Sequence, residues 1–396
     1  MMRRLSLSRT QIISFAFGHH VTFSALSRTS KTFPRGYATR FGYAVAKCLT
    51  FANYGQPGKV LSLHSHSISP PYEDNITVKF LASPINPADI NQIEGVYPEK
   101  PAFTLSLGTT ENVAVPGNEG LVQVVSCGSK VNPSIRAGEW ALMANPSFGT
   151  WRTYALAKES DLIMIPNREG ISPINAATVS VNPSTAYRML QDFGNLQKGD
   201  YFIQNAANSS VGRSAIQIAR IWGFRSINIV RDRPEIEDLK KELLSLGGTA
   251  VLTEEEVRDK ARISEITGGK PIKLALNCVG GESAMNIART LGQHGHLVTY
   301  GAMAKQPLSL PASLLIFKDI HCHGFWISAW SKGNEAAKSR MIGQILEWIR
   351  NGQFHPLPCE ITTWSDETEL RTLLAAVKNG ISEFSGKKSV FLMQNT

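Results

Sequence analysis

Small side chains crowd residues 204–212, which read Gln-Asn-Ala-Ala-Asn-Ser-Ser-Val-Gly between a predicted strand and a predicted helix. Backbone N–H groups and the positive end of the helix meet at such a turn, which suits it to binding a pyrophosphate. Only Gly212 remains of the usual glycine-rich fingerprint, because serines stand where glycines are common. A purely structural turn is the alternative. The sequence predicts a pyrophosphate site lined by Asn208, Ser209, Ser210 and Val211.

Two arginines flank an aspartate at the end of the next predicted strand, in Arg231-Asp232-Arg233. Enzymes that bind NAD place an acidic residue on the ribose 2′-hydroxyl about 20 residues after the phosphate turn. Guanidinium groups at this place suit a 2′-phosphate instead, because each one binds phosphate through two hydrogen bonds. We expect Asp232 to cap the turn or to contact the ribose. A solvated charge cluster is the alternative, and the spacing favours NADP(H).

Strands and helices alternate around these two motifs. Predicted strands cover residues 201–205, 226–230, 250–252, 273–279 and 296–300, and predicted helices cover 211–222, 234–246 and 282–291. In the first helix Arg213, Gln217 and Arg220 form the face opposite the apolar one, and Pro234 suits the first turn of the second. This alternation predicts a Rossmann-type doubly wound parallel sheet, the α/β fold class, over residues 181–334.

The preceding residues have a different pattern. Residues 46–180 are β-rich, with short stretches such as 76–81, 120–125 and 140–143 between turns that contain glycine and proline. An amphipathic helix is predicted over 336–349, after which the chain returns to the first domain. We therefore expect a β-rich catalytic domain, similar to GroES, made of residues 43–180 and 335–396.

The charge is concentrated at the amino terminus. Residues 1–45 hold seven arginines and lysines and no acidic residue, so subtracting them from the net charge of +9 leaves +2 for the rest. A nearly neutral body argues against nucleic-acid binding, and no apolar run is long enough for a membrane helix. An arginine- and serine-rich leader predicts a mitochondrial transit peptide, residues 1–42, and a protein of the matrix. A secretory signal with its apolar core at residues 12–17 is the weaker alternative, since His19 and His20 follow at once.

The sequence resembles the medium-chain dehydrogenase/reductase superfamily over nearly all of residues 46–396. Residues 83–89, Ser-Pro-Ile-Asn-Pro-Ala-Asp, look like the segment that carries a zinc-binding cysteine in alcohol dehydrogenases, with Asn86 in its place. Residues 117–120, Gly-Asn-Glu-Gly, look like their Gly-His-Glu-Gly segment, with Asn118 for the zinc-binding histidine. The four-cysteine lobe is also missing. The resemblance is thus to the zinc-free branch, and it implies no metal.

Within that branch the sequence resembles the mitochondrial trans-2-enoyl-CoA (enoyl-acyl-carrier-protein) reductases. The segments that carry this resemblance are 91–98, 181–190, 231–233, 277–281, 300–307, 314–319 and 324–326. The resemblance implies NADPH-dependent reduction of the 2,3 double bond of an enoyl thioester. Hydride goes to the β-carbon and a proton goes to the α-carbon.

Residue roles follow from the same resemblance. Tyr97 matches the catalytic tyrosine, and a tyrosine can donate a proton and hydrogen-bond an enolate oxygen. Asn182 matches a contact near the nicotinamide, and Lys388 matches a further cofactor contact. Ala302 stands where we expect glycine. The remaining expected cofactor contacts follow a strand end or complete the nicotinamide pocket, and they are Tyr300, Gly301, Ala302, Met303, Phe325, Trp326, Ile327 and Ser328.

Partners and rival functions remain to be distinguished. The resemblance implies a homodimer joined through an edge strand within residues 314–326, and transient binding to acyl carrier protein, with Lys332, Lys338 and Arg340 as candidate docking residues. One rival is a zinc-free quinone or alkenal reductase. Another is a non-catalytic NADPH-binding regulatory protein. Four histidines are spaced like metal ligands, but we expect structural roles for them, and they are His294, His296, His321 and His323.

Overall fold

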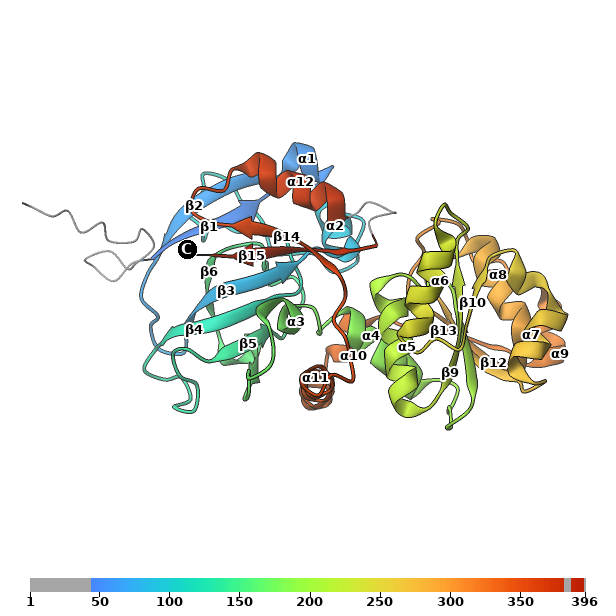
Figure 1. Cartoon of the computed structure of the whole chain (residues 1–396). Coiled ribbons are helices and arrows are strands. Elements are labelled where there is room, and N and C mark those ends of the chain that lie inside the picture. Colours follow the sequence, from blue (N-terminus) through green and yellow to red (C-terminus); the bar gives the residue numbers. More distant parts are fainter. Residues whose placement is uncertain (1–43, 381–385, 395–396) are drawn as a thin grey trace, which may run out of the picture. The chain divides into compact units, whose positions relative to one another are not determined.

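The structure is a computed structural model that describes residues 44–380 and 386–394 (Figure 1). The predicted transit peptide, residues 1–42, lies outside the described residues. Among the residues that are described, no helix has the length and apolar character needed to cross a membrane.

A six-stranded parallel sheet forms the α/β part. Its strands lie in the order β10-β9-β8-β11-β12-β13, and every adjacent pair is parallel. The chain therefore starts at the centre, runs to one edge and then crosses back to build the other half, as in the doubly wound fold. The predicted fold class is confirmed. The strands are β8 (Tyr201–Gln204), β9 (Arg225–Val230), β10 (Ala250–Thr253), β11 (Ile272–Asn277), β12 (Leu291–Thr299) and β13 (His321–Gly324).

Helices cover both faces of this sheet (Figure 1). One face carries α5 (Ser210–Trp222) and α6 (Ile236–Ser245), and the other carries α7 (Lys260–Thr267), α8 (Gly281–Thr290) and α9 (Ala312–Lys318). The central strands β8, β9 and β11 bury apolar side chains on both faces, because parallel strands have helices on either side. The crevice at the carboxyl ends of β8 and β11, where the strand order reverses, is where such sheets bind ligands.

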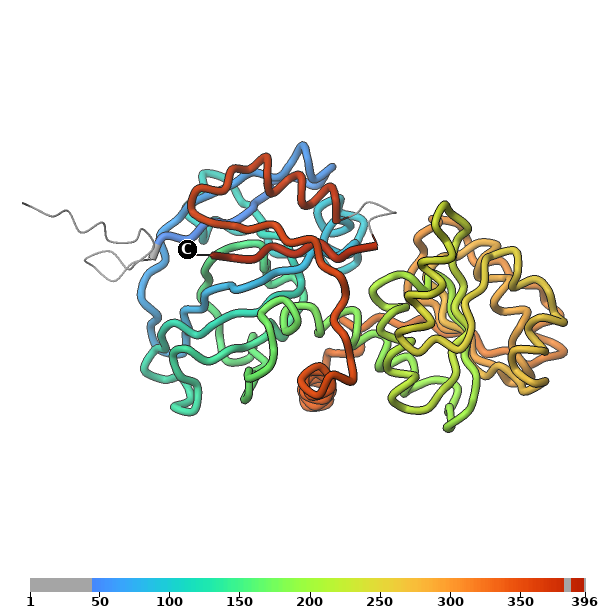
Figure 2. The backbone as a smooth tube through the Cα atoms, in the orientation of Figure 1, coloured from blue at the N-terminus to red at the C-terminus, as the bar shows by residue number. Residues whose placement is uncertain are grey.

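A mixed sheet forms the β-rich part. Its path is β14-β15-β3-β4-β5-β7, with β6 also pairing with β3, and β1 and β2 form a separate pair. The last two strands of the chain join this sheet beside strands from its first part (Figure 2). Strand β15 pairs with β3 in the antiparallel direction. The strands are β1 (Ala44–Thr50), β2 (Ser62–Ile68), β3 (Ile76–Pro84), β4 (Leu121–Cys127), β5 (Trp140–Met143), β6 (Tyr154–Ala157), β7 (Leu162–Ile165), β14 (Cys359–Trp364) and β15 (Lys388–Met393).

The remaining helices connect and cover these strands. They are α1 (Pro57–Val60), α2 (Pro87–Ile93), α3 (Pro173–Ala177), α4 (Asn182–Asp192), α10 (Ile327–Ser331), α11 (Glu335–Arg350) and α12 (Leu370–Gly380), with 3-10 helices η1 (Glu159–Asp161) and η2 (Glu256–Arg258). All strands of the six-stranded parallel sheet fall within 181–334, while β14 and β15 join the mixed sheet. On this basis we retain the predicted domain limits as a proposal.

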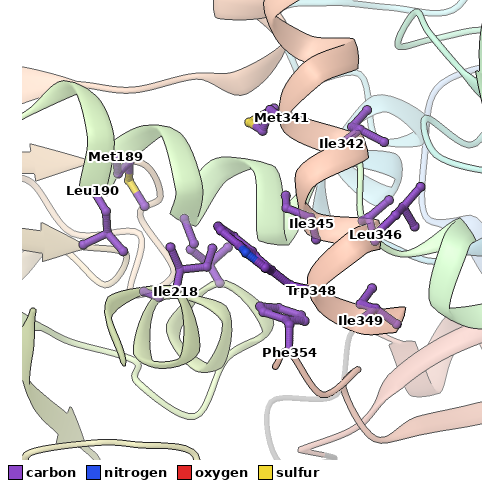
Figure 3. Close-up of a cluster of buried hydrophobic side chains, with 14 of the residues drawn as sticks. Met189, Leu190, Ile218, Met341, Ile342, Ile345, Leu346, Trp348, Ile349 and Phe354 are labelled. Atoms are coloured by element: carbon purple, nitrogen blue, oxygen red, sulfur yellow. The ribbon is translucent and has the colours of Figure 1, made fainter. Parts of the chain in front are cut away.

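A large apolar core gathers around α11. This helix buries one face against α4 and α5, as its predicted amphipathic pattern requires (Figure 3). The Trp348 ring packs against Tyr187 and Trp222, with ring centroids 5.8 and 6.1 Å away. Burying one such side chain stabilises the fold by about 3 kcal/mol.

Some predicted boundaries are wrong. The second cofactor-domain helix, α6, begins at Ile236, because Glu235 adopts a left-handed backbone with φ of 62° and serves as the N-cap. Pro234 therefore lies outside the helix. Strand β12 begins at Leu291, earlier than predicted, since α8 ends at Thr290. Within residues 314–326 the edge strand is only β13, and α9 occupies the first part.

Candidate active site

A cavity of about 420 Å³ opens beside the phosphate turn and the ends of the central strands. Eight of the residues predicted to bind cofactor line it, and they are Asn182, Asn208, Ser209, Ser210, Val211, Arg231, Met303 and Lys388. These residues come from segments far apart in the sequence, so only the fold brings them together.

The turn that the sequence assigned to pyrophosphate has the required geometry. Ser209 is the N-cap of α5, and its hydroxyl accepts a hydrogen bond from the Gly212 N–H at 3.1 Å. The N–H groups of Ser210 and Val211, in the first turn, have no intrahelical acceptor and are available to an anion. A Cβ at Gly212 would lie 2.5 Å from the Ala207 carbonyl oxygen, which explains why glycine persists here while serines replace the others.

Arg213 supports this turn, which corrects the sequence prediction for α5. The predicted outer face included Arg213 and Gln217, but both side chains are buried. Arg213 Nε donates to the Asn208 carbonyl oxygen at 2.9 Å, and its guanidinium pairs with Glu242. Gln217 accepts from the His355 N–H at 2.7 Å. Helix α6 and the 354–358 segment cover this face. The helical period shows that the face is polar, but it does not show whether water or other polar groups of the protein contact it.

The arginine triplet follows β9 directly. Arg231 lines the cavity, whereas Asp232 is exposed and, like Arg233, does not line it. The buried Arg233 Nε has no hydrogen-bond partner among residues 44–380 and 386–394, so it fits an additional anionic acceptor. Glu254, which the sequence did not single out, also lines the cavity, and burial raises the pKa of its carboxyl. Its Oε1 accepts from the Ser283 hydroxyl at 2.7 Å.

Tyr97 and Trp326 form a separate group. The Trp326 indole donates to the Tyr97 hydroxyl oxygen at 2.8 Å, and the rings meet edge to face with centroids 5.7 Å apart. Because the hydroxyl accepts this bond, its own proton remains available to another acceptor. Burial raises the pKa of Tyr97, while hydrogen bonds from Trp326 and Ser328 act in the opposite direction. The tyrosine is therefore neutral at physiological pH.

Other predicted residues surround these two groups without lining the larger cavity. Phe325 packs on Phe193 with centroids 6.1 Å apart. Ile327 and Ser328 line a recess of about 30 Å³. A Cβ at Gly301 would lie 3.0 Å from the Cys278 sulfur, so this glycine permits a close approach. Ala302 is exposed. The Tyr300 hydroxyl is buried, and its burial raises the pKa of Tyr300 well above its ordinary value.

A buried polar network begins at the cavity. Lys388 Nζ donates to Asn86 Oδ1, and Asn182 Nδ2 lies 3.4 Å from the same oxygen. Asn86 Nδ2 in turn donates to Glu119 Oε2 at 3.1 Å. Burial lowers the pKa of Lys388. Asn86, which stands where the resemblance places a zinc ligand, is thus engaged in amide hydrogen bonds that link the cavity to the carboxylate of Glu119.

The network continues to the loop that carries Tyr97. Asp89 Oδ1 accepts from the Asn118 backbone N–H at 3.0 Å and from its side-chain amide at 2.6 Å. The same amide donates to Gln92 Oε1 at 2.7 Å. Gln92 Nε2 donates to the Glu99 carbonyl at 2.9 Å, while the Tyr97 N–H donates to the Asn91 carbonyl at 3.1 Å. The loop is therefore held on both sides of Tyr97.

Sequence reasoning missed Asp89, Gln92 and Glu119 as parts of the site. The only signal for them was that they are polar residues inside segments that resemble a known family. A short helix and a turn are too short to show a periodic pattern that would predict burial. Burial raises the pKa of Asp89 to about 6, and its hydrogen bonds oppose that shift.

One of the three predicted docking residues for acyl carrier protein, Lys338, is wrong for that role. Lys338 is buried, and its Nζ donates to the Ala144 carbonyl at 2.6 Å. Lys332 is exposed but pairs with Glu99 at 3.0 Å. Only Arg340 is an exposed member of the set without such an ion pair among the described residues.

Comparison with known proteins agrees with this geometry. A family model described as zinc-binding dehydrogenase matches residues 210–341. The mitochondrial enoyl-(acyl-carrier-protein) reductase of Yarrowia lipolytica is 45% identical over 343 residues, which cover 85% of this chain and 89% of the relative. A structure of the Etr1p/NADP/crotonyl-CoA complex superposes with a TM-score of 0.83 at 38% identity, covering 88% of this chain and 99% of that one. The Etr1p/Etr2p heterodimer of Candida tropicalis gives 0.83 at 39% identity, with the same coverage.

The doubly wound sheet, its phosphate turn and the mixed sheet built from both ends of the chain define a medium-chain dehydrogenase/reductase. Within that superfamily, the chain belongs to the mitochondrial enoyl-(acyl-carrier-protein) reductase family.

Proposed function

We propose that this chain reduces the 2,3 double bond of trans-2-enoyl thioesters with NADPH in mitochondria, and that Tyr97 donates the proton to the α-carbon. The observation that carries the role of Tyr97 is its hydrogen bond from Trp326, which leaves the phenolic proton to be donated. The function itself is that of the family to which the chain belongs.

The residues around the cavity fit NADPH. Asn208, Ser209, Ser210 and Val211 hold the pyrophosphate at the start of α5, and Arg231 with Arg233 holds the ribose 2′-phosphate, with Asp232 beside it. The orphaned Arg233 Nε and the unbonded first-turn N–H groups support this fit. Bound here, the nicotinamide supplies the hydride for the β-carbon. The remaining proposed contacts are Asn182, Tyr300, Gly301, Ala302, Met303, Phe325, Trp326, Ile327, Ser328 and Lys388.

The protein's own contribution is position and a proton. Tyr97 hydrogen-bonds the thioester oxygen, where negative charge develops, and delivers its proton to the α-carbon. Trp326 fixes the ring and keeps the hydroxyl proton turned away from itself. The raised pKa of Tyr97 keeps the donor protonated throughout the physiological range. The buried amide network from Lys388 to Gln92 fixes the position of the Tyr97 loop relative to the cavity wall.

Three further features belong to this proposal. Residues 1–42 direct the chain to the matrix and are removed there. The acyl group is carried by acyl carrier protein or coenzyme A, which share the thioester. The chain forms a homodimer through the edge strand β13, whose outer side pairs with no other described strand.

The test is NADPH oxidation by protein lacking residues 1–42, with a trans-2-enoyl-CoA as acceptor. Replacing the donor in Tyr97→Phe lowers kcat by about 10²- to 10⁴-fold, because one positioned proton transfer is lost. NADPH binding, followed by fluorescence, stays unchanged. Tyr72→Phe is the matched control, since Tyr72 is 74% exposed.

Each other result points elsewhere. Full activity in Tyr97→Phe removes this tyrosine as the donor. Turnover of a quinone without turnover of the thioester makes the chain a quinone reductase. Tight NADPH binding with neither activity favours a regulatory protein.

A further inference from the structure

Histidines gather at the outer edge of the parallel sheet. His294 and His296 lie on β12, His321 and His323 lie on the edge strand β13, and Asp319 lies just before that strand. These are four of the chain's nine histidines. None of them lines the 420 Å³ cavity or the smaller recess, so the proposed reaction leaves the group without a role.

Three of these side chains direct ligand atoms toward one point. His294 Nδ1 is 2.9 Å from Asp319 Oδ2, and His321 Nε2 is 3.6 Å from the same oxygen. All three ligand atoms lie within 4.8 Å of one another. Ligands about 2.1 Å from a tetrahedral ion are roughly 3.4 Å apart, so small rotations of these exposed side chains suffice to enclose one ion.

The other two histidines support this arrangement. His296 pairs with His321 across the strands, and their rings stack with centroids 5.2 Å apart. His296 Nδ1 lies 2.9 Å from His323 Nε2, and the His323 ring contacts Phe193. A stacked neighbour restricts the rotation of His321, and a ligand that is already ordered loses less entropy when it binds an ion.

We propose that His294, Asp319 and His321 form a binding site for a divalent transition-metal ion such as Zn²⁺. Two imidazoles and one carboxylate suit zinc and its neighbours in the first row, whereas Mg²⁺ and Ca²⁺ prefer oxygen ligands alone. Water completes the coordination on the exposed side. The ion ties β12 to the edge strand β13, and its effect is on the stability of that edge.

The test uses the full-length chain with His19 and His20 replaced by asparagine in every sample, so that the leader offers no imidazole. Metal-free protein is titrated with ZnCl₂ in a calorimeter, and bound zinc per chain is measured after gel filtration. We expect one ion per chain. His321→Asn and Asp319→Asn each weaken zinc affinity roughly tenfold or more. His355→Asn, which alters an exposed histidine outside the cluster, leaves it unchanged.

Thermal unfolding gives a second readout. Zinc raises the melting temperature of the parent chain and of His355→Asn, because it binds the folded state, and it does so far less for the two ligand variants. MgCl₂ at the same concentration has no effect. The proposal is overturned if zinc does not bind, if it binds the ligand variants equally well, or if one ion is bound per two chains.

Discussion

At the scale of single residues, charges and amides decide which chemistry this fold carries. Asn86 and Asn118, which stand where the resemblance places zinc ligands, bond to Lys388, Asp89 and Gln92 instead. Amides offer a donor and an acceptor together, so they link a buried lysine to buried carboxylates at hydrogen-bond distance.

Asp89 gives a prediction about pH. Its pKa is raised from 3.8 to about 6 by burial, so the folded state binds a proton more tightly than the unfolded chain. The stabilising contribution is complete below pH 3.8 and is lost as the pH rises through 6, and it amounts to about 3 kcal/mol. The free energy of unfolding, measured in urea between pH 4 and pH 7, should fall more steeply with pH in the parent chain than in Asp89→Asn. Parallel curves would contradict the raised pKa.

Arg233 gives a prediction about cofactor choice. Arg233→Ala removes the guanidinium whose Nε is buried without a described partner. We expect NADPH to bind roughly 10- to 100-fold more weakly, while NADH affinity stays the same, because a charged hydrogen bond to the 2′-phosphate is lost. Fluorescence titration with both nucleotides measures this. Arg371→Ala is the control, since that side chain is 84% exposed. An equal loss of affinity for NADPH and NADH would show that Arg233 does not contact the 2′-phosphate.

At the scale of elements, the short helix α2 positions Tyr97. Asn86 and Asp89 form a capping box at its start, and the Asn91 carbonyl near its end accepts from the Tyr97 N–H. Gln92 then reaches the Glu99 carbonyl beyond the tyrosine. A helix of two turns has little stability of its own, so these side chains are what hold the loop.

Gln92→Leu tests this arrangement. The change removes the bond to Glu99 and leaves the Asn118 amide short of an acceptor, so the Tyr97 loop loses its position. We expect kcat to fall roughly tenfold or more, because a misplaced donor is costly even when all reacting groups are present. NADPH affinity should be unchanged, and stability should drop by about 1–3 kcal/mol. Steady-state kinetics and nucleotide titration separate these effects. A rise in KM with constant kcat would assign Gln92 to substrate binding alone.

At the scale of the whole molecule, one core joins segments far apart in the chain. Helix α11 packs its apolar face on α4 and α5, and Trp348 contacts Tyr187 and Trp222 (Figure 3). The strands that follow α11, β14 and β15, then complete the mixed sheet. Loss of packing in this core therefore lowers the stability of both sheets.

Trp348→Ala tests how much this core contributes to the free energy of unfolding. The indole is only 6% exposed, so its removal leaves a cavity that costs about 3–5 kcal/mol of unfolding free energy. Urea denaturation followed by circular dichroism measures the loss. Ile361→Ala, at a side chain that is 49% exposed, should change stability far less. A small effect at Trp348 would mean that the surrounding helices close the cavity.

Much of this protein followed from its sequence. Strand–helix alternation specified the doubly wound sheet, because the periods of 3.6 and 2 residues are properties of the backbone that side-chain type reveals. The turn at Ser209 and Ser210 and the arginine triplet were also found, since both are contiguous and their ligand is anionic. Gly212 was recognised as part of the turn, and the structure gives the reason, the 2.5 Å approach to Ala207.

Only the tertiary structure decided the rest. It buried Arg213 and Gln217 under α6 and a distant loop, reversing their predicted exposure, because a helical face does not reveal what covers it. It brought Trp326 onto Tyr97 and Lys388 onto Asn86, pairs separated by more than two hundred residues. It also moved Lys338 from a predicted docking surface into the interior. Side-chain type and spacing carry local structure, whereas long-range contacts exist only after the chain has folded.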